Sequence, residues 1–362
     1  MPLEQLAQQA ADHPADREML VLLAERSLAQ REPARAEEAM RLLLEKDPGD
    51  ARAWLLRSRA ELDQNHLPQA YASVQVAKPL AAGNPEVPYV LGQILERQGD
   101  EQEAEARYRE TVALDPTHTG ARLELARFAL AHRHYGPARE HLEAILKRIP
   151  THVIALELLS NTLRFQGELP AAEKLARRAT VLAPRSSRAW NALALVLQAR
   201  ALPAPLVEAE AAFRKVLELD SESADAHTQL GRLLFNRGDY RAAIRELESA
   251  LRIHGLNRLP YPLLMQCYRR VGEPAKAAAL QREYEKINDM DLATAPLEYS
   301  IYAMPDNVGL RLRLARLYAT YGRPDLARDQ VERVLRINPR QGDALRMKTE
   351  YDRTPSASKK PE

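Results

Sequence analysis

The sequence predicts an all-α solenoid, in which antiparallel helix pairs stack one on the next. Three observations predict it. Small residues, glycines and prolines recur with a period of 34 residues. Each copy contains two segments of about 12 to 14 residues with the apolar spacing of a helix. The composition also favours helices, because Ala and Leu are abundant while Phe, Trp and Tyr make up only 5% of the chain.

The repeat is clearest in residues 230–251, LGRLLFNRGDYRAAIRELESAL. Gly231 follows a leucine, Gly238 comes seven residues later, and Ala243 comes five residues after that. With Gly231 counted as position 8, copies begin at residues 17, 51, 85, 119, 153 and 187 without slippage, and then at 224, 258 and 308. The sequence therefore predicts nine copies with two irregular joints.

Each recurring position has a structural reason. Small residues at positions 8 and 20 let two antiparallel helices approach closely. Glycine at position 15 suits the turn between them, because glycine tolerates a positive φ. Proline at position 32 cannot continue a helix and so helps to end the second one. One helix pair cannot bury both of its faces, and neighbouring pairs must therefore stack.

The spacing resembles the tetratricopeptide repeat, whose pattern is W-x2-L-G-x2-Y, then A-x3-F, then P. The residues that carry the resemblance are Trp190, Leu193, Ala194 and Leu197; Ala209 and Phe213; Ala104, Tyr108 and Pro116; and Leu314, Ala315 and Tyr318. It covers residues 17 to about 341. The second copy departs from the pattern, because Arg57 and Ser58 replace Leu-Gly. The resemblance implies a right-handed superhelix with a concave surface lined mainly by the first helix of each repeat.

We expect one solenoid over residues 1–352. It comprises an N-terminal capping or half-repeat helix at 1–16, repeats at 17–50, 51–84, 85–118, 119–152, 153–186, 187–223, 224–257 and 258–288, an irregular insertion at 289–307, repeat 9 at 308–341 and a capping helix at 342–352. Residues 353–362 are polar and are predicted to be a disordered tail. The half-repeat at the start leaves open that the chain derives from a longer protein.

Two places depart from the period. The turn in repeat 6, residues 199–210, is three residues longer, and we expect Pro203 and Pro205 to make it a surface loop. The segment 289–306 adds sixteen residues and contains Tyr299, Tyr302 and Met304. Such apolar side chains are unusual in a solvated linker, so we expect the segment to pack on the superhelix. It would either cover an edge or lie in the groove as a plug.

The chain lacks the short motifs of hydrolases, metalloproteases and nucleotide-binding enzymes. The single cysteine, Cys267, excludes an internal disulfide framework, and we interpret it as a small buried residue. His132, His134 and His141 are interpreted as solvated residues rather than metal ligands. His118 and His152, both at position 34, are interpreted as packing or capping residues. We therefore predict a protein that is not an enzyme and has no cofactor or metal.

The resemblance implies that position 9 of each first helix faces the concave surface. Arginines and amides recur there and at position 12 or 13. Arginine offers a planar fork for carboxylates, and amides can hold a peptide backbone. We therefore predict an interaction scaffold that binds an extended, partly acidic peptide or partner protein. The predicted contact residues are Arg59, Arg127, Asn161, Arg164, Arg232, Gln266 and Arg316.

Two alternative functions remain open. The chain could be an accessory subunit of a larger, membrane-associated assembly that binds through its ends or convex face. It could instead bind an anionic polymer, although the net charge of +2 argues against nucleic acid.

The carboxylate clamp of some family members is not reproduced, because Glu157 and Ala192 stand at two of its positions. Without an apolar run long enough to span a bilayer, the location reads as cytoplasmic, or as periplasmic or membrane-tethered if the chain is truncated. Partner identity and oligomeric state stay open.

Overall fold

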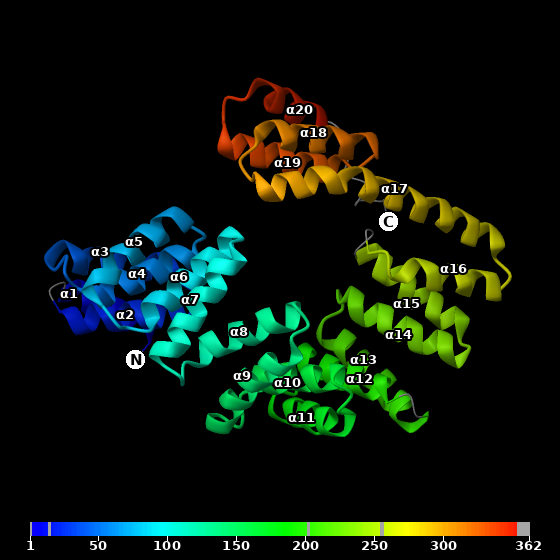
Figure 1. Ribbon diagram of the computed structural model, residues 1–362, viewed down its shortest axis with the longest axis horizontal. Coiled ribbons are helices and arrows are strands. Elements are labelled where there is room, and N and C mark those ends of the chain that lie inside the picture. Colours follow the sequence, from blue (N-terminus) through cyan, green and yellow to red (C-terminus); the bar gives the residue numbers. More distant parts are fainter. Residues whose placement is uncertain (1, 14–15, 201–202, 254–256, 353–362) are drawn as a thin grey trace. The chain divides into compact units, whose positions relative to one another are not determined.

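The computed structural model describes residues 2–13, 16–200, 203–253 and 257–352, and within these ranges it consists of helices and holds no β-strand (Figure 1). The helices form two compact units, Met1–Ala212 and Phe213–Glu362. The all-α class predicted from the sequence is confirmed. None of the described helices is both long and apolar enough to cross a membrane.

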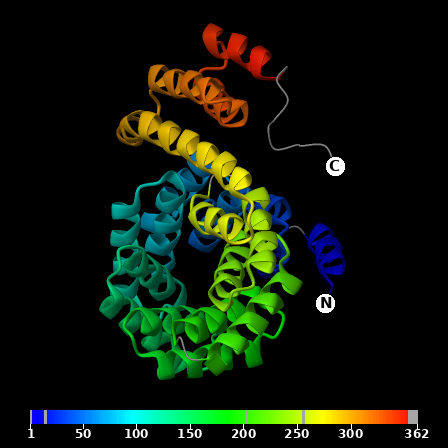
Figure 2. The ribbon, with the colours of Figure 1, turned by 90° about the vertical axis from the view of Figure 1, so that its right-hand side faces the viewer.

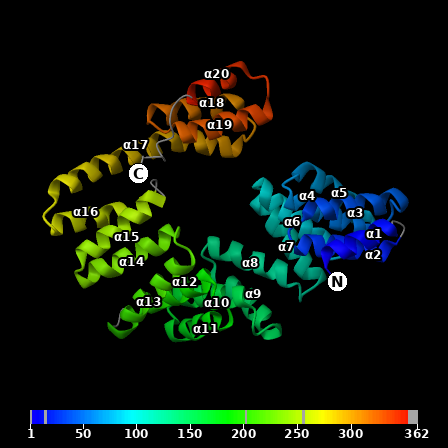
Figure 3. The same ribbon diagram turned by 180° about the vertical axis from the view of Figure 1, so that it is seen from behind.

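The helices alternate as first and second members of antiparallel pairs, and pairs such as α10 with α11 and α18 with α19 lie side by side in Figures 1 and 3. The first helices are α2 (Arg17–Ala29), α4 (Ala51–Asp63), α6 (Glu86–Gln98), α8 (Thr119–Ala131), α10 (Val153–Phe165), α12 (Ser187–Ala199), α14 (Ala224–Arg237), α16 (Pro260–Arg270) and α18 (Val308–Thr320). The second helices are α3 (Pro33–Lys46), α5 (Leu67–Leu80), α7 (Glu101–Leu114), α9 (Tyr135–Arg148), α11 (Leu169–Leu182), α13 (Pro203–Leu219), α15 (Tyr240–Ile253), α17 (Pro274–Ala303) and α19 (Pro324–Ile337). α1 (Leu3–Asp12) packs on α2, and α20 (Gly342–Asp352) packs on α19.

Among the described residues, the turn inside eight of the pairs holds one residue in the left-handed region. Gly99 and Gly167, both at position 15, have φ values of 87° and 82°. Three described turns lack glycine at this position, and the backbone still adopts the same conformation: φ is 60° at Arg31, 60° at Asn65 and 59° at Arg133. The turn geometry is therefore imposed by the helix pair, and these three side chains accept a conformation that L-residues disfavour.

Close packing within a pair is aided by a small side chain at position 8, which eight of the nine copies have, the exception being Met265. A Cβ placed on Gly231 would lie 2.7 Å from Cγ of Leu247 on the second helix. In the second repeat, where the family pattern is lost, the Ser58 hydroxyl donates to the backbone carbonyl of Ala70 at position 20, at 2.7 Å. Ser58 is fully buried. A serine is thus small enough for the two helices to pack closely, and its buried hydroxyl has a hydrogen-bond acceptor.

Successive pairs are joined by a recurring hydrogen bond. The side chain at position 4 donates to the backbone carbonyl six residues earlier, which is position 32 of the preceding copy in three of the four bonds described next. Trp54 Nε1 donates to Pro48 at 2.8 Å and Trp190 Nε1 donates to Pro184 at 2.9 Å. In other copies the arginine Nε replaces the indole, from Arg122 to Pro116 at 2.7 Å and from Arg311 to Pro305 at 2.8 Å. The bond satisfies the carbonyl of a proline in the loop that connects the two pairs.

The predicted irregular insertion at 289–307 is wrong for most of its length, because α17 continues as a helix to Ala303 (Figure 2). The reason lies in the period. Ala293 and Pro305 stand 34 residues before Ala327 and Pro339, which are positions 20 and 32 of the last repeat. Residues 290–303 therefore have the pattern of a second helix in register with α18, and they run on from the second helix of repeat 8 without a turn.

The predicted loop at 199–210 also needs correction. α12 ends at Ala199 and α13 begins at Pro203, so most of the segment is helical. Proline is tolerated in the first turn of a helix, because the backbone N–H groups there have no helical acceptor. The predicted tail, residues 353–362, lies outside the described residues.

The left-handed turn predicts a stabilising substitution. Arg133→Gly should raise the free energy of unfolding by up to about 1 kcal/mol, because glycine adopts this φ without the cost that arginine incurs. Gly167→Ala should lower it by about the same amount. Urea titration followed by circular dichroism measures both changes.

Gly136→Ala is the matched control. Gly136 lies in the first turn of α9, outside the left-handed region, and a Cβ there would meet no other atom within 4 Å. This substitution should be neutral or slightly stabilising. If Arg133→Gly destabilised the protein, the account of the turn would be refuted.

The single thiol offers a second test. Cys267 on α16 is fully buried, and burial raises its pKa to about 11. Its reactive thiolate form is therefore scarce at about pH 8. A thiol-specific dye should label the native protein negligibly and label one equivalent after unfolding. Rapid labelling of the native protein would contradict the placement of Cys267.

Candidate functional site

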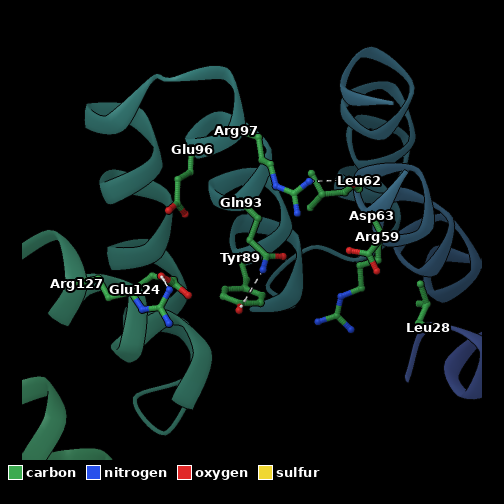
Figure 4. A pocket seen from close by; sticks show the side chains of 10 residues that line it. All are labelled: Leu28, Arg59, Leu62, Asp63, Tyr89, Gln93, Glu96, Arg97, Glu124 and Arg127. Carbon is green, nitrogen blue, oxygen red and sulfur yellow. Dashed lines mark hydrogen bonds and ion pairs between the residues drawn. The ribbon is translucent and has the colours of Figure 1, made fainter. Parts of the chain in front are cut away.

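A pocket of about 590 Å³ lies in the first unit, and side chains from four successive first helices line it (Figure 4). Its lining residues are Leu28 from α2; Arg59, Leu62 and Asp63 from α4; Tyr89, Gln93, Glu96 and Arg97 from α6; and Glu124 and Arg127 from α8. Three of them, Arg59, Gln93 and Arg127, occupy position 9 of consecutive repeats. The 34-residue period thus brings equivalent residues of neighbouring helices to one cavity.

The pocket carries three arginines and three carboxylates, so its formal charges balance. Arg97 donates from Nη1 to the backbone carbonyl of Leu62 at 3.1 Å, as Figure 4 shows. Arg59 donates to Glu86 Oε2 at 2.6 Å. Arg127 is paired more loosely, because its Nη1 lies 3.6 Å from Glu124 Oε2. Among these three cations, Arg127 is the one least committed to a partner within the chain.

Glu124 is the less exposed member of its pair, with 16% of its side chain accessible against 47% for Arg127. Burial raises the pKa of the Glu124 carboxyl above its ordinary value, Arg127 opposes that rise, and the nearby Glu96 adds to it. The ionised form of Glu124 is therefore less favoured in the folded protein than in water.

Arg59 is held in place by a chain of contacts that begins at the cap of α8. The Nδ1 of His118 accepts from the backbone N–H of Ala121 at 3.0 Å, which confirms the predicted capping role. The Nε2–H of the same neutral tautomer then donates to Glu86 Oε1 at 3.1 Å. This hydrogen bond holds the pKa of Glu86 below its ordinary value against the opposite effect of burial, and Arg59 lowers it further. The ring of Tyr89 lies beside His118, with centroids 4.6 Å apart.

A second pocket of about 600 Å³ adjoins the first and shares Arg59 with it. It is lined by Arg17, Glu25, Asp47, Gly49, Asp50, Ala51, Arg52, Leu55, Leu56, Arg59, Asn84 and Glu86. Two of its arginines are paired inside the chain, since Arg17 Nε lies 2.5 Å from Asp50 Oδ2 and Arg52 Nη2 lies 2.5 Å from Glu25 Oε1. Hollows thus follow one another along α2, α4, α6 and α8.

Asn161 and Arg164, also predicted as contact residues, lie on α10 and line neither pocket. The Nη2 of Arg164 donates to Oδ1 of Asn161 at 2.6 Å. The guanidinium of Arg164 lies 4.1 Å from the ring centroid of Phe165, which stacks on Tyr135 at 5.2 Å. Burial lowers the pKa of Arg164. These two residues form a separate local cluster with a half-exposed phenyl ring.

The other three predicted residues belong to the second unit and line neither pocket. Arg232 and Gln266 are exposed on α14 and α16. Arg316 on α18 lies 3.4 Å from Asp343. The structure therefore brings two pairs of the predicted contacts together, Arg59 with Arg127 in the first pocket and Asn161 with Arg164 on α10.

Sequence reasoning missed the acidic half of the first pocket. It considered only arginines and amides at positions 9, 12 and 13, whereas the carboxylates are Glu124 at position 6, Glu96 at position 12 and Asp63 at position 13. Tyr89, at position 5, was also not singled out. A scan of all positions on the same helical face, regardless of charge, would have found them.

Glu124 gives this site a pH-dependent signature. A folded-state pKa raised by burial contributes stability at low pH, and that contribution is lost as the pH rises through the folded-state pKa. Glu124→Gln should therefore raise the thermal midpoint relative to wild type at about pH 8 and lose this advantage at about pH 4. An advantage that did not change with pH would contradict the assignment to ionisation of Glu124.

Comparisons with known proteins agree with the repeat. Two family models, both described as "Tetratricopeptide repeat", match the chain, one at residues 95–152 and 206–261 and the other at residues 21–85. The chain is 32% identical over 190 residues to the cellulose synthase operon protein C of Xanthomonas axonopodis pv. citri (strain 306). The match covers 51% of this chain and only 12% of that much longer protein.

A solved structure shares the fold. A tetratricopeptide repeat protein from Parabacteroides merdae is similar with a TM-score of 0.50 and 16% identity, over 69% of this chain and 98% of that one. A thermophilic protein of the same kind from Thermus thermophilus has a TM-score of 0.43 and 21% identity, over 52% of this chain and 98% of that one. The chain therefore belongs to the tetratricopeptide repeat family, whose repeats serve as scaffolds for protein–protein interaction.

Proposed function

We propose that the first unit holds an extended, partly acidic peptide segment of a partner protein along α2, α4, α6 and α8. The observation that carries this proposal is the convergence of Arg59, Gln93 and Arg127 on one pocket. An extended segment suits such a surface, because consecutive repeats offer it the same side-chain position again and again.

Arg127 supplies the contact for an acidic side chain. Its guanidinium is about half exposed and its internal carboxylate partner lies 3.6 Å away, so a ligand carboxylate can approach without displacing a short ion pair. Gln93 lies one repeat earlier, and its amide donates weakly to the Tyr89 hydroxyl at 3.3 Å. An amide at this place can instead bond the backbone of a bound peptide.

The internal carboxylates explain why the ligand should be only partly acidic. Arg59 is already bound by Glu86, and Arg97 by a backbone carbonyl. Asp63 and Glu96 face the same cavity and would repel a run of acidic side chains. A ligand that alternates an acidic residue with neutral or basic ones fits this balance. A uniformly anionic polymer fits it poorly.

The affinity requires more than one contact. A well-placed hydrogen bond to a charged group contributes about 1.5–3 kcal/mol, whereas micromolar binding needs about 8 kcal/mol. The two adjoining pockets, which share Arg59, allow one peptide to engage several repeats at once.

The proposal is tested with a surface array of ten-residue peptides of mixed charge. Peptides that contain one or two Asp or Glu residues should bind the wild type at least about tenfold more tightly than Arg59→Glu/Arg127→Glu, because the variant replaces attraction by repulsion. Arg109→Glu is the control, since Arg109 is 68% exposed on the second helix α7 and pairs with Glu105. Equal binding by wild type and the double variant would refute the pocket assignment.

A second candidate is an accessory subunit of a larger assembly, and the relative named for a cellulose synthase operon favours it. In that case the peptide array would retain nothing. Wild type and Arg59→Glu/Arg127→Glu would then capture the same cellulose synthase subunits from detergent-solubilised membranes of the source cells. Mass spectrometry of the captured proteins distinguishes the two candidates.

A further inference from the structure

The C-terminal half of α17 has apolar residues on two sides. Met290, Thr294 and Ile301 are buried on the inner side, where α17 packs against α18. On the outer side, Leu292, Tyr299 and Tyr302 are 79%, 78% and 75% exposed. Ala295, Pro296 and Ala303 are exposed with them. Their spacing of three, four and seven residues places all six on one side of the helix, and we call them the α17 stripe.

Packing within the chain does not account for the α17 stripe. The comparison with α19 shows this, because α19 repeats the same register one period later. Tyr299 and Tyr302 correspond there to Arg333 and Arg336, both exposed. Arg333 lies 2.9 Å from Asp329 and forms part of an ordinary charged surface. The same helical positions thus carry exposed arginines in α19 and exposed tyrosines in α17.

The charged residues within the segment that carries the stripe are all acidic. Residues 287–310 contain no Lys or Arg, whereas the whole chain has 52 of them. The acidic residues of this segment are Asp289, Asp291, Glu298 and Asp306. Asp291 pairs with Arg258 at 3.2 Å, and Glu298 accepts from the Tyr318 hydroxyl at 2.6 Å. Asp289 and Asp306 are exposed, one just before the stripe and one just after it.

We propose that the α17 stripe is a docking surface for a basic amphipathic helix of a partner protein. An apolar face bracketed by carboxylates complements a helix whose apolar side is flanked by Lys or Arg. A second copy of this chain does not meet that requirement, because pairing two stripes would bring two acidic segments together. This site is separate from the pockets in the first unit.

Pro296 adds a polar feature to the stripe. It has no backbone N–H to give to the carbonyl of Leu292, four residues earlier, so that carbonyl is without its usual helical donor. Leu292 is itself part of the exposed side. A Lys or Arg side chain on the incoming helix could donate to this oxygen while its stem lies on the apolar residues.

The surface is large enough for a weak but specific contact. Residues 292–303 make about three helical turns, or roughly 17 Å. Two tyrosines and a leucine, each about three quarters exposed, offer on the order of 400 Å², which is in the range of functional apolar patches on soluble proteins.

Fluorescence anisotropy with two labelled helical peptides tests the proposal. Both have about 18 residues with Leu on one face, and the other face carries Lys in one peptide and Glu in the second. The Leu/Lys peptide should bind the full chain at least tenfold more tightly than the Leu/Glu peptide. Tyr299→Ser/Tyr302→Ser should weaken the Leu/Lys peptide at least tenfold, whereas Val181→Ser should leave it unchanged.

Val181 is a matched control, because it is also 79% exposed and lies on a second helix, α11, in the other unit. Circular dichroism verifies that both variants keep the wild-type helicity. The proposal is overturned if the Leu/Lys peptide fails to bind, if the Leu/Glu peptide binds equally well, or if Tyr299→Ser/Tyr302→Ser binds like wild type. It is also overturned if sedimentation shows a wild-type dimer that this double variant dissociates.

Discussion

The close approach of the two helices in each pair is the constraint on which the rest of the structure depends. It is favoured by a small residue at position 8, as Gly231 and Ser58 show, although repeat 8 carries Met265 there, and by a left-handed residue in the turn between the helices. Because the distance within a pair is fixed in this way, the next pair can repeat the same joint. The bond from Trp54 to Pro48 and the bond from Arg311 to Pro305 then recur with nearly the same length.

The same regularity creates the candidate site. Position 9 of three consecutive first helices falls on one cavity because those helices are stacked in register. The ion pairs that these position-9 residues make within the chain are less regular than their placement. Arg59 is tied to Glu86 and, through Glu86, to the cap of α8 at His118, whereas Arg127 has only a long contact to Glu124. Two arginines at the same repeat position therefore differ in their availability to a ligand.

The sequence was sufficient to predict what depends on spacing. The helical class, the family and the left-handed glycines follow from a 34-residue period and from residue types with strong local preferences. For His118 the sequence left packing and capping both open, and the structure shows the cap. The continuation of α17 as one helix through residues 289–303 was not predicted, because the absence of a turn between two helical segments is not marked by any particular residue type. The period carried by Ala293 and Pro305 was nevertheless present. The acidic lining of the pocket was missed for another reason: Glu96 and Glu124 look like solvated helix residues until the neighbouring helices are placed beside them.

Because α17 is continuous, it fixes the rotation of the C-terminal helices about its own axis. A helix of 30 residues extends for about 45 Å and turns by about 100° per residue. α16 packs on this helix, and α18 packs on it farther along. Without an intervening loop to absorb a change, each residue added to or removed from the helix between them would turn α18, α19 and α20 about its axis by roughly 100°. The number of residues in α17 therefore sets the direction in which that end of the protein faces.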